Sequence, residues 1–286
     1  MARTRPARYS SSNARQLSAL CRFQSGSLQG TRGQGLATYK ELIRNMSTKT
    51  KPEGGALSLI LDRWISNVQT DTAVATGLAL DDNAFAPAVE QRIMNVIRSM
   101  QNLVHGFDFA RLLSLYYRAF TEGDDELKGK VLKWFRGEYA TKTEARQELG
   151  VTVIISDDDW YDYLKLLAYF FRQAGYAGLM VFIDELVNIY KIPNSISRQY
   201  NYEKMLTMYN DALQGKAQYI GMVMSGTPQC VEDRHRGIYS YEALRSRLQE
   251  GKFAQSQGVQ DLMGPVLRLQ PLTSEEMLVL TEKLAD

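Results

Sequence analysis

Residues that bind soft metal ions are scarce in this chain of 286 residues, which has two cysteines and two histidines. So small a set disfavours a zinc or iron site, because such sites take most of their ligands from these residue types. Cys21 and Cys230 stand far apart, which is typical of a reducing compartment rather than of a disulfide framework. We therefore expect neither a zinc or iron centre nor a disulfide-linked scaffold.

Long apolar runs and a large net charge are also missing. No segment approaches the roughly 18 consecutive apolar residues of a membrane-spanning helix, so we expect a cytoplasmic protein without a membrane partner. The formal net charge is only +2, and bulk electrostatics therefore indicates no nucleic-acid or membrane partner. Hydrophobic residues make up 44% of the chain, enough for the core of one large domain or two small ones.

Acidic residues are absent between Met1 and Lys40, although this segment contains many arginines. Its start, MARTRPARYSSSNARQ, is rich in arginine and serine and has neither apolar periodicity nor the apolar stretch of a secretory signal. We predict a disordered basic tail over residues 1–27. An organellar transit peptide and a nucleic-acid-binding arm are the alternatives that this composition leaves open.

Helical periodicity dominates residues 28–150. A first helical pattern runs from Thr38 to Met46, and the segment ALSLILDRWISNVQ then places Leu57, Leu61, Trp64, Ile65 and Val68 on one helical face. Three later segments show the same period: FAPAVEQRIMNVIRSMQNLV, FDFARLLSLYYRAF and DDELKGKVLKWFRGEY. We predict a helical block over residues 28–150, with no strand between 55 and 150.

Strand and helix patterns alternate from residue 151 onward. Leu179–Ile183 and Tyr219–Met224 are continuous apolar runs typical of buried parallel strands, and a helix from about Ser197 to Leu213 separates them. Val151–Ile155 is predicted to be either a strand or an extended lead-in, and PVLRL at 265–269 a short strand.

Two capping boxes, Ser156 with Asp159 and Thr273 with Glu276, predict the starts of further helices. The alternation indicates right-handed βαβ units. We therefore predict an α/β fold over residues 151–286: a three-layer core with a parallel sheet, into which the helical block is inserted before the central strand.

Two adjacent carboxylates, Asp184 and Glu185, end the apolar run in GLMVFIDELVNIY. Open α/β sheets bind ligands at the carboxyl ends of their strands. A carboxylate there can hold Mg²⁺ together with nucleotide phosphates, and the neighbouring glutamate can orient or deprotonate an attacking water. We predict Asp184 as the metal ligand and Glu185 as the catalytic residue. The alternative is a strand end whose aspartate only caps the next helix.

A second strand end carries hydroxyl groups, because Ser225 and Thr227 follow the strand in GMVMSGTPQ. They can contact the terminal phosphate of a nucleotide, and Thr227 can also cap a helix that begins at Pro228. Arg245 and Arg247 in YEALRSRL cannot share one helical face. One of them can reach a phosphate, within its own subunit or across the interface of a homo-oligomer, and the other is then a surface residue.

A phosphate-binding loop is missing from the sequence. Such a loop has the pattern G-x-x-x-x-G-K-[ST], in which backbone N–H groups and the lysine hold the phosphates. The stretch GTRGQGLAT (30–38) comes nearest, but Leu36 follows Gly35 where lysine is required, and we expect no apolar strand before it. We assign it to a turn before a helix. No Gly-Lys pair in the chain is followed by serine or threonine.

Several motifs in order resemble the ATP-binding proteins of bacterial BREX phage-defence systems, P-loop ATPases related to the AAA+ group. They are LQGTRGQGLATYKELIRNMSTKTKPEGGAL, GLMVFIDELVNIYK, SGTPQCVED, YSYEALRSRL and LRLQPLTSEEM. The resemblance covers roughly residues 28–286. It implies ATP and Mg²⁺ as cofactors and other defence-system proteins as partners. It also implies Walker B roles for Asp184 (magnesium) and Glu185 (catalysis), and a sensor role for Thr227.

In that family the Walker A phosphate loop lies upstream of the stretch that begins here at Leu28, and further helical sequence follows. The resemblance therefore implies a truncated ATPase subunit, weak or inactive alone. Two other hypotheses stay open. One is a degenerate, non-enzymatic ATPase module for assembly or signalling, which the retained acidic pair disfavours. The other is a DNA-binding adaptor that uses the basic tail; the charged loop DRHRG (233–237), predicted to be solvated, is an alternative contact for DNA or a partner.

Overall fold

The computed structural model describes residues 17–22, 34–249, 264–269 and 271–285, and the side chains of all these except 17–22, 34 and 285. The chain divides into two compact units, Met1–Cys230 and Val231–Asp286. The helical block and the strands therefore belong to one unit, and the structure places no domain boundary at the predicted position, residue 150. None of the described helices is long and apolar enough to cross a membrane.

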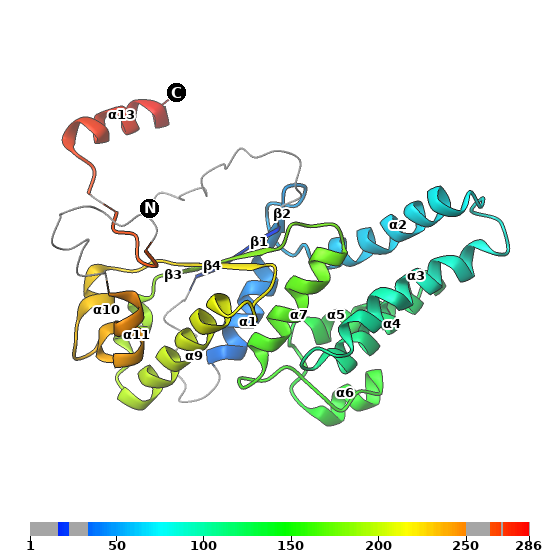
Figure 1. Ribbon diagram of the computed structural model, residues 1–286, viewed down its shortest axis with the longest axis horizontal. Helices are drawn as coiled ribbons and strands as arrows, with labels where there is room; N and C mark the ends of the chain where they lie inside the picture. Colours follow the sequence, from blue (N-terminus) through cyan, green and yellow to red (C-terminus); the bar gives the residue numbers. More distant parts are fainter. Residues whose placement is uncertain (1–16, 23–33, 250–263, 270, 286) are drawn as a thin grey trace. The chain divides into compact units, whose positions relative to one another are not determined.

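A small, largely parallel sheet organises the first unit (Figure 1). The order of its described strands is β2 (Met46–Thr48), β1 (Leu17–Arg22), β3 (Leu179–Asp184) and β4 (Ile220–Met224). Strand β3 is parallel to both of its neighbours, whereas the short β2 is antiparallel to β1. The predicted pairing of the two apolar runs as neighbouring parallel strands is thus confirmed. The mostly helical unit with this sheet is consistent with the predicted α/β class.

Strand β1 is the main departure from the sequence prediction. Residues 17–22 belong to the segment that we predicted to be a disordered tail, yet they pair along their whole length with β3, from Leu17 opposite Leu179 to Arg22 opposite Asp184. The expectation that no strand precedes the stretch 30–38 is wrong for the same reason. The run LSALCR is short and interrupted by polar residues, and its strand conformation depends on pairing with β3. Residues 1–16 and 23–27 of the predicted tail lie outside the described residues.

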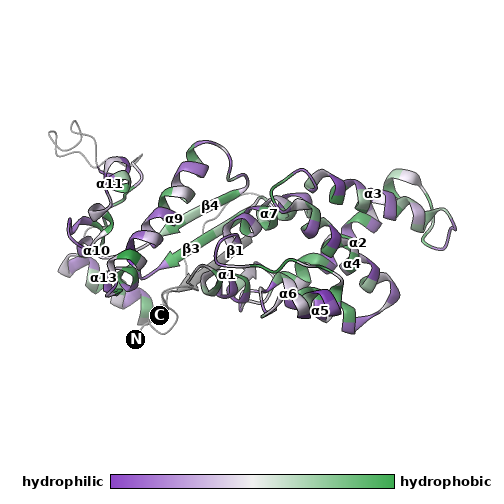
Figure 2. Ribbon diagram, turned by 90° about the horizontal axis from the view of Figure 1, so that it is seen from below, coloured by the Kyte–Doolittle hydropathy of each residue, from purple (hydrophilic) through white to green (hydrophobic). Residues whose placement is uncertain are grey.

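Three helices cover one face of this sheet: α1 (Gln34–Asn45), α7 (Trp160–Gln173) and α9 (Ser195–Leu213) (Figures 1 and 2). Strand β3 alternates accordingly: Leu179, Val181 and Ile183 are buried beneath the helices. Met180 and Val223 point to the opposite face and are 37% and 46% exposed. In the described part of the first unit, helices therefore cover one face of β3 and β4, not the two of the predicted three-layer core.

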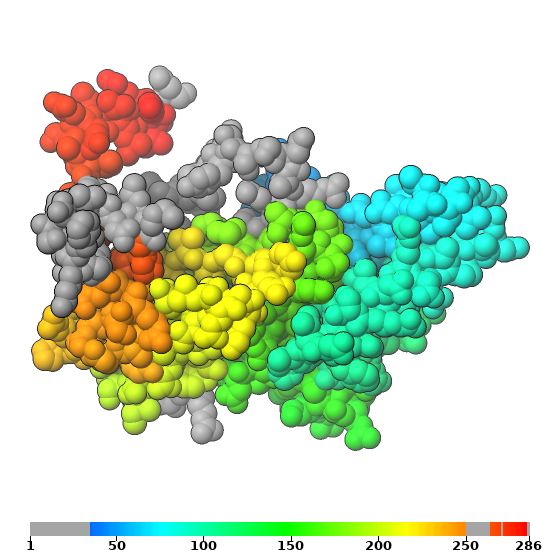
Figure 3. Space-filling view, viewed as in Figure 1, coloured from blue at the N-terminus to red at the C-terminus, as the bar shows by residue number. Residues whose placement is uncertain are grey.

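Between residues 55 and 150 the helical block contains no strand, as predicted, whereas the short β2 lies in the earlier part of the block, which we predicted to be helical. Its helices pack in sequence order, α2 with α3, α3 with α4, α4 with α5 and α5 with α6, and Figure 3 shows most of them in cyan and green as a continuous body. Their bounds are Leu57–Thr76, Phe85–Met100, Gly106–Glu122, Asp125–Phe135 and Lys142–Leu149 for α2 to α6.

Helix α7 joins this block to the sheet. Ser156 N–H donates to Asp159 Oδ1 over 2.7 Å, one bond of the predicted box, but α7 begins only at Trp160, with Asp159 as its N-cap. The residues before this box, 151–155, form no strand. On the block side, Phe170 meets the Trp64 ring edge-to-face at 5.0 Å between centroids.

Two predictions for other segments have different outcomes. Residues 265–269 are described and form no strand, because an apolar run becomes a strand only where a partner strand accepts its backbone. The box at Thr273 is confirmed, since its N–H donates to Glu276 Oε2 over 2.8 Å and its hydroxyl accepts from Glu276 N–H. The helices in the described residues of the second unit are η2 (Ile238–Ser240), α11 (Glu242–Leu248) and α13 (Ser274–Ala285).

Helix α1 begins earlier than predicted, at Gln34, so Gly35 lies within the helix and not in a turn. Close packing requires a glycine here: a Cβ atom at Gly35 would lie 2.3 Å from Trp160 Nε1. Asp157 fixes the same junction, because its Oδ1 accepts from the N–H of Leu36 over 2.8 Å. The first turn of α1 is therefore docked directly on the start of α7.

We expect Gly35→Ala to lower the free energy of unfolding by about 1–3 kcal/mol, because the added methyl group overpacks the contact with Trp160. Chemical denaturation monitored by circular dichroism measures this change. The matched control is Gly129→Ala in α5, where an added Cβ meets nothing within 4 Å. That change should stabilise the protein by about 0.5–1 kcal/mol. Equal effects of both substitutions would contradict the packing argument.

Candidate functional site

Asp184 and Ser225 meet at the carboxyl ends of β3 and β4. The Ser225 hydroxyl donates a hydrogen bond to Asp184 Oδ1. The same carboxylate oxygen accepts the backbone N–H of Glu185 over 2.8 Å. The two predicted strand ends thus come together at one edge of the sheet, with a carboxylate and a hydroxyl in direct contact.

Glu185 occupies a strained turn directly after β3. Its φ is +60°, in the left-handed region that non-glycine residues rarely adopt, at a cost of roughly 1–3 kcal/mol. Neighbouring backbone bonds hold this turn: Leu186 N–H donates to Ser225 O over 3.0 Å, and Asn188 N–H to Glu185 O over 2.9 Å. The turn aims the Glu185 side chain toward α8 (Val187–Lys191), where Asn188 Nδ2 donates to Glu185 Oε2 over 3.2 Å.

Sequence reasoning missed Asn188. It is one of few buried polar residues among those described, with 7% of its surface exposed. The available signal was its place in DELVNIY, as the polar residue among the apolar positions that follow the acidic pair. A buried amide needs hydrogen-bond partners, and here one of them is a predicted catalytic carboxylate.

Thr227 caps the next helix, α10 (Pro228–Glu232), as the alternative interpretation of this residue predicted. Its Oγ1 accepts from Cys230 N–H over 3.4 Å, and its carbonyl oxygen from the buried Cys230 thiol over 3.1 Å. Between the two hydroxyl residues, Gly226 packs against Leu186 and Cys230 so closely that an added Cβ would lie 2.5 Å from the sulfur. The loop after β4 is thereby held against the turn after β3.

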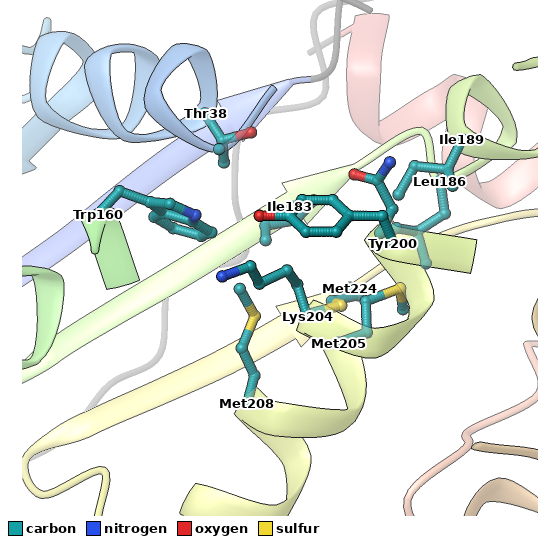
Figure 4. Close-up of a pocket in the computed structure, with 12 residues that line it drawn as sticks. Thr38, Trp160, Ile183, Leu186, Ile189, Tyr200, Lys204, Met205, Met208 and Met224 are labelled. Carbon is teal, nitrogen blue, oxygen red and sulfur yellow. The ribbon is translucent and has the colours of Figure 1, made fainter. Parts of the chain in front are cut away.

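A small cavity of about 40 Å³ lies behind these strand ends, on the helical face of the sheet (Figure 4). Ile183 and Met224, the residues before Asp184 and Ser225, form part of its wall, and the remainder comes from α1, α7, α8 and α9 together with Leu186. Trp160 Nε1 at this cavity is buried and has no hydrogen-bond partner. This volume accommodates about three water molecules and is too small for a nucleotide base. The strand-end surface is therefore the better candidate site.

The predicted arginines belong to the second unit, whose helix α11 contains both. Arg245 pairs with Glu242, one turn earlier in the same helix. Arg247 Nη1 donates to the carbonyl oxygen of Ala243 over 2.8 Å. These contacts are local to α11, so a role of either arginine at a phosphate stays a prediction.

The residues at the strand ends fit a magnesium ion that shares its coordination with phosphates. Mg²⁺ prefers oxygen ligands and in nucleotide sites takes only one or two carboxylates from the protein. Asp184 and Ser225 offer a carboxylate and a hydroxyl oxygen side by side. Among the described residues there is no cluster of three or more histidine, cysteine or acidic side chains, so the site does not have the ligand set of an all-protein metal centre.

Parallel strands that end in a contacting carboxylate and hydroxyl define an α/β protein whose candidate ligand site lies at the strand ends. The sequence agrees with a more specific assignment. The family described as BREX system ATP-binding protein BrxC/D matches residues 19–286, and the chain belongs to this family. The match includes part of β1, upstream of the limit that we predicted at residue 28. No curated protein and no solved structure matched the chain.

We expect Gly226→Ala to destabilise the first unit by about 1–3 kcal/mol, because the new methyl group overlaps the Cys230 sulfur. The double variant Gly226→Ala/Cys230→Ala removes that sulfur, so its loss of unfolding free energy should be smaller than the sum of the two single losses. Thermal and urea denaturation of all three variants measure this coupling. Strictly additive losses would show that the sulfur is not the atom that excludes a side chain at position 226.

Proposed function

We propose that this chain is an ATP-binding subunit of a BREX-type phage-defence system, in which Asp184 and Glu185 serve Mg²⁺-dependent hydrolysis of ATP. The observation that carries the proposal is the contact between Asp184 and Ser225 at adjacent parallel strand ends, in a member of an ATP-binding family. Family membership supports a role in defence and in ATP binding. The roles of individual residues and the P-loop character of the core are part of the proposal.

Each residue has a distinct role in this proposal. Asp184 and Ser225 would hold the magnesium ion, which when bound supplies positive charge to the phosphates. Glu185 takes the proton of a water whose oxygen forms a bond to the γ-phosphorus. The bond between that phosphorus and the bridging oxygen breaks, and its electron pair leaves with ADP. Thr227, three residues after β4, would sense the γ-phosphate, and Arg245 or Arg247 would neutralise its charge.

The sequence does not contain a phosphate-binding loop. Helix α1 follows strand β1 in the chain, but the sequence between them contains no Gly-Lys followed by serine or threonine. Loop N–H groups and that lysine make most phosphate contacts in P-loop proteins. We therefore propose that a phosphate-binding loop outside this sequence completes the site. Cytoplasmic partners of the same defence system would supply that loop.

We expect this 286-residue chain alone to bind Mg-ATP with a dissociation constant on the order of 1 mM or weaker, a free energy of about 4 kcal/mol. Carboxylates repel a polyphosphate, and the chain lacks the loop lysine that would offset this repulsion. Hydrolysis by the chain alone should be undetectable. Isothermal titration calorimetry and a phosphate-release assay measure both quantities, and micromolar binding by the chain alone would contradict the proposal.

A polypeptide that carries a Gly-Lys-Ser/Thr loop should restore binding and hydrolysis when it is joined to or mixed with this chain. In that assembly Glu185→Gln should abolish turnover and leave ATP binding within about twofold, because a general base contributes about 10²–10⁴-fold to rate and little to binding. The matched control is Glu122→Gln, the same change at an exposed position of α4. Normal turnover by the Glu185 variant would show that Glu185 is not the general base of this hydrolysis.

A further inference from the structure

We infer that Asn188 is a positioning residue for Glu185: its side-chain amide fixes the carboxylate of the proposed general base. The inference rests on the proposed function, because it assigns a role in the same hydrolysis. The observation behind it is the hydrogen bond from Asn188 Nδ2 to Glu185 Oε2, 3.2 Å long. A single anchored oxygen leaves Oε1 as the acceptor for the proton of water.

The backbone around Glu185 makes such an anchor necessary. A general base must hold its carboxylate within hydrogen-bond reach of one proton, and a glutamate side chain with three rotatable bonds does so only when a partner restricts it. The φ of +60° turns Glu185 away from the direction of β3, toward α8. Asn188 lies there, one helical turn later, and its backbone N–H also bonds to Glu185 O over 2.9 Å.

Burial makes Asn188 a rigid anchor. Its surface is 7% exposed, so its rotamer is fixed by packing, whereas Glu185 is exposed and would otherwise sample several rotamers. Burial of an amide is unfavourable unless the amide is hydrogen-bonded, so the carboxylate and the amide stabilise each other's positions. The strained backbone of Glu185 and its contact with the buried Asn188 occur together, a combination typical of functional sites.

Asn188 could instead have a purely structural role, in which its contact with Glu185 only stabilises the start of α8. The same contact resembles the polar box that begins many helices, and α8 follows directly. If it only started α8, loss of the Asn188 side chain would lower stability but would not separate kcat from KM. The two roles therefore predict different results for the same variants.

The first experiment uses the full chain without nucleotide or metal and follows the side-chain amide protons of ¹⁵N-labelled asparagine by NMR. Loss of the Asn188 signal in Asn188→Asp assigns it. We expect Glu185→Ala to speed exchange of the Asn188 amide protons about tenfold, which corresponds to the loss of about one net hydrogen bond. Unchanged exchange would show that the two side chains are not coupled and would overturn the inference.

The second experiment measures ATP hydrolysis by this chain assembled with its loop-bearing partner. Asn188→Ala should lower kcat about tenfold and leave KM for ATP within about twofold, because it releases the base but leaves the residues at the phosphates in place. Asn188→Asp should be at least as slow, since a carboxylate there repels Glu185. The control is Tyr190→Phe, which removes a different side-chain hydrogen bond of α8, the one that Tyr190 accepts from Gln229 Nε2 over 3.2 Å, and it should leave kcat unchanged.

The outcomes separate the two hypotheses. If Glu185→Gln leaves hydrolysis intact, the proposed function is wrong. If Glu185→Gln abolishes hydrolysis while Asn188→Ala leaves kcat unchanged, the function stands and the positioning role is wrong. Equal loss of activity in Asn188→Ala and Tyr190→Phe, matched by equal loss of stability, would show that α8 acts only as scaffold.

Discussion

The first unit depends on the burial of helix α7 on nearly all of its sides. Nine of its residues are buried, among them Trp160, Tyr163, Phe170 and Phe171. The buried residues surround all of the helix except one polar stripe that contains Asp162, Lys165 and Arg172, so α1 and the sheet cover one side and the helical block another. Trp160 docks under α1, and Phe170 packs on Trp64 of α2. Because α7 leads directly into β3, this burial also positions the strand that ends at Asp184.

The candidate site lies where two constraints meet. The sheet aligns the ends of β3 and β4, and the tight packing of Gly226 on Leu186 joins the loops that follow them. Within that frame Glu185 adopts a conformation that an isolated peptide would avoid, and Asn188 receives its carboxylate. The free energy that keeps the strained turn in place comes from packing elsewhere in the unit, which is how folds commonly support geometry useful for chemistry.

The sequence predicted those features whose signal is local. Continuous apolar runs revealed β3 and β4, and the boxes at Ser156 and Thr273 formed as their spacing indicated. Features that depend on distant partners were not predictable. LSALCR becomes β1 because β3 pairs with it, whereas the comparably apolar run at 265–269 forms no strand. The burial of α7 side chains such as Phe170 also depends on partners that are far away in the sequence. The contact between Asn188 and Glu185 depends on the positive φ of Glu185, which no residue pattern predicts.

The hydrogen bond from Leu186 N–H to Ser225 O has a dynamic consequence. It ties the turn after β3 to the end of β4, so neither segment can open without breaking a bond to the other. Local opening of the edge would then be cooperative, and the amide protons of both turns would exchange with solvent as one group. Whatever displaces the loop at Ser225 therefore also moves Glu185, and the occupancy of one strand end is transmitted mechanically to the residue at the other.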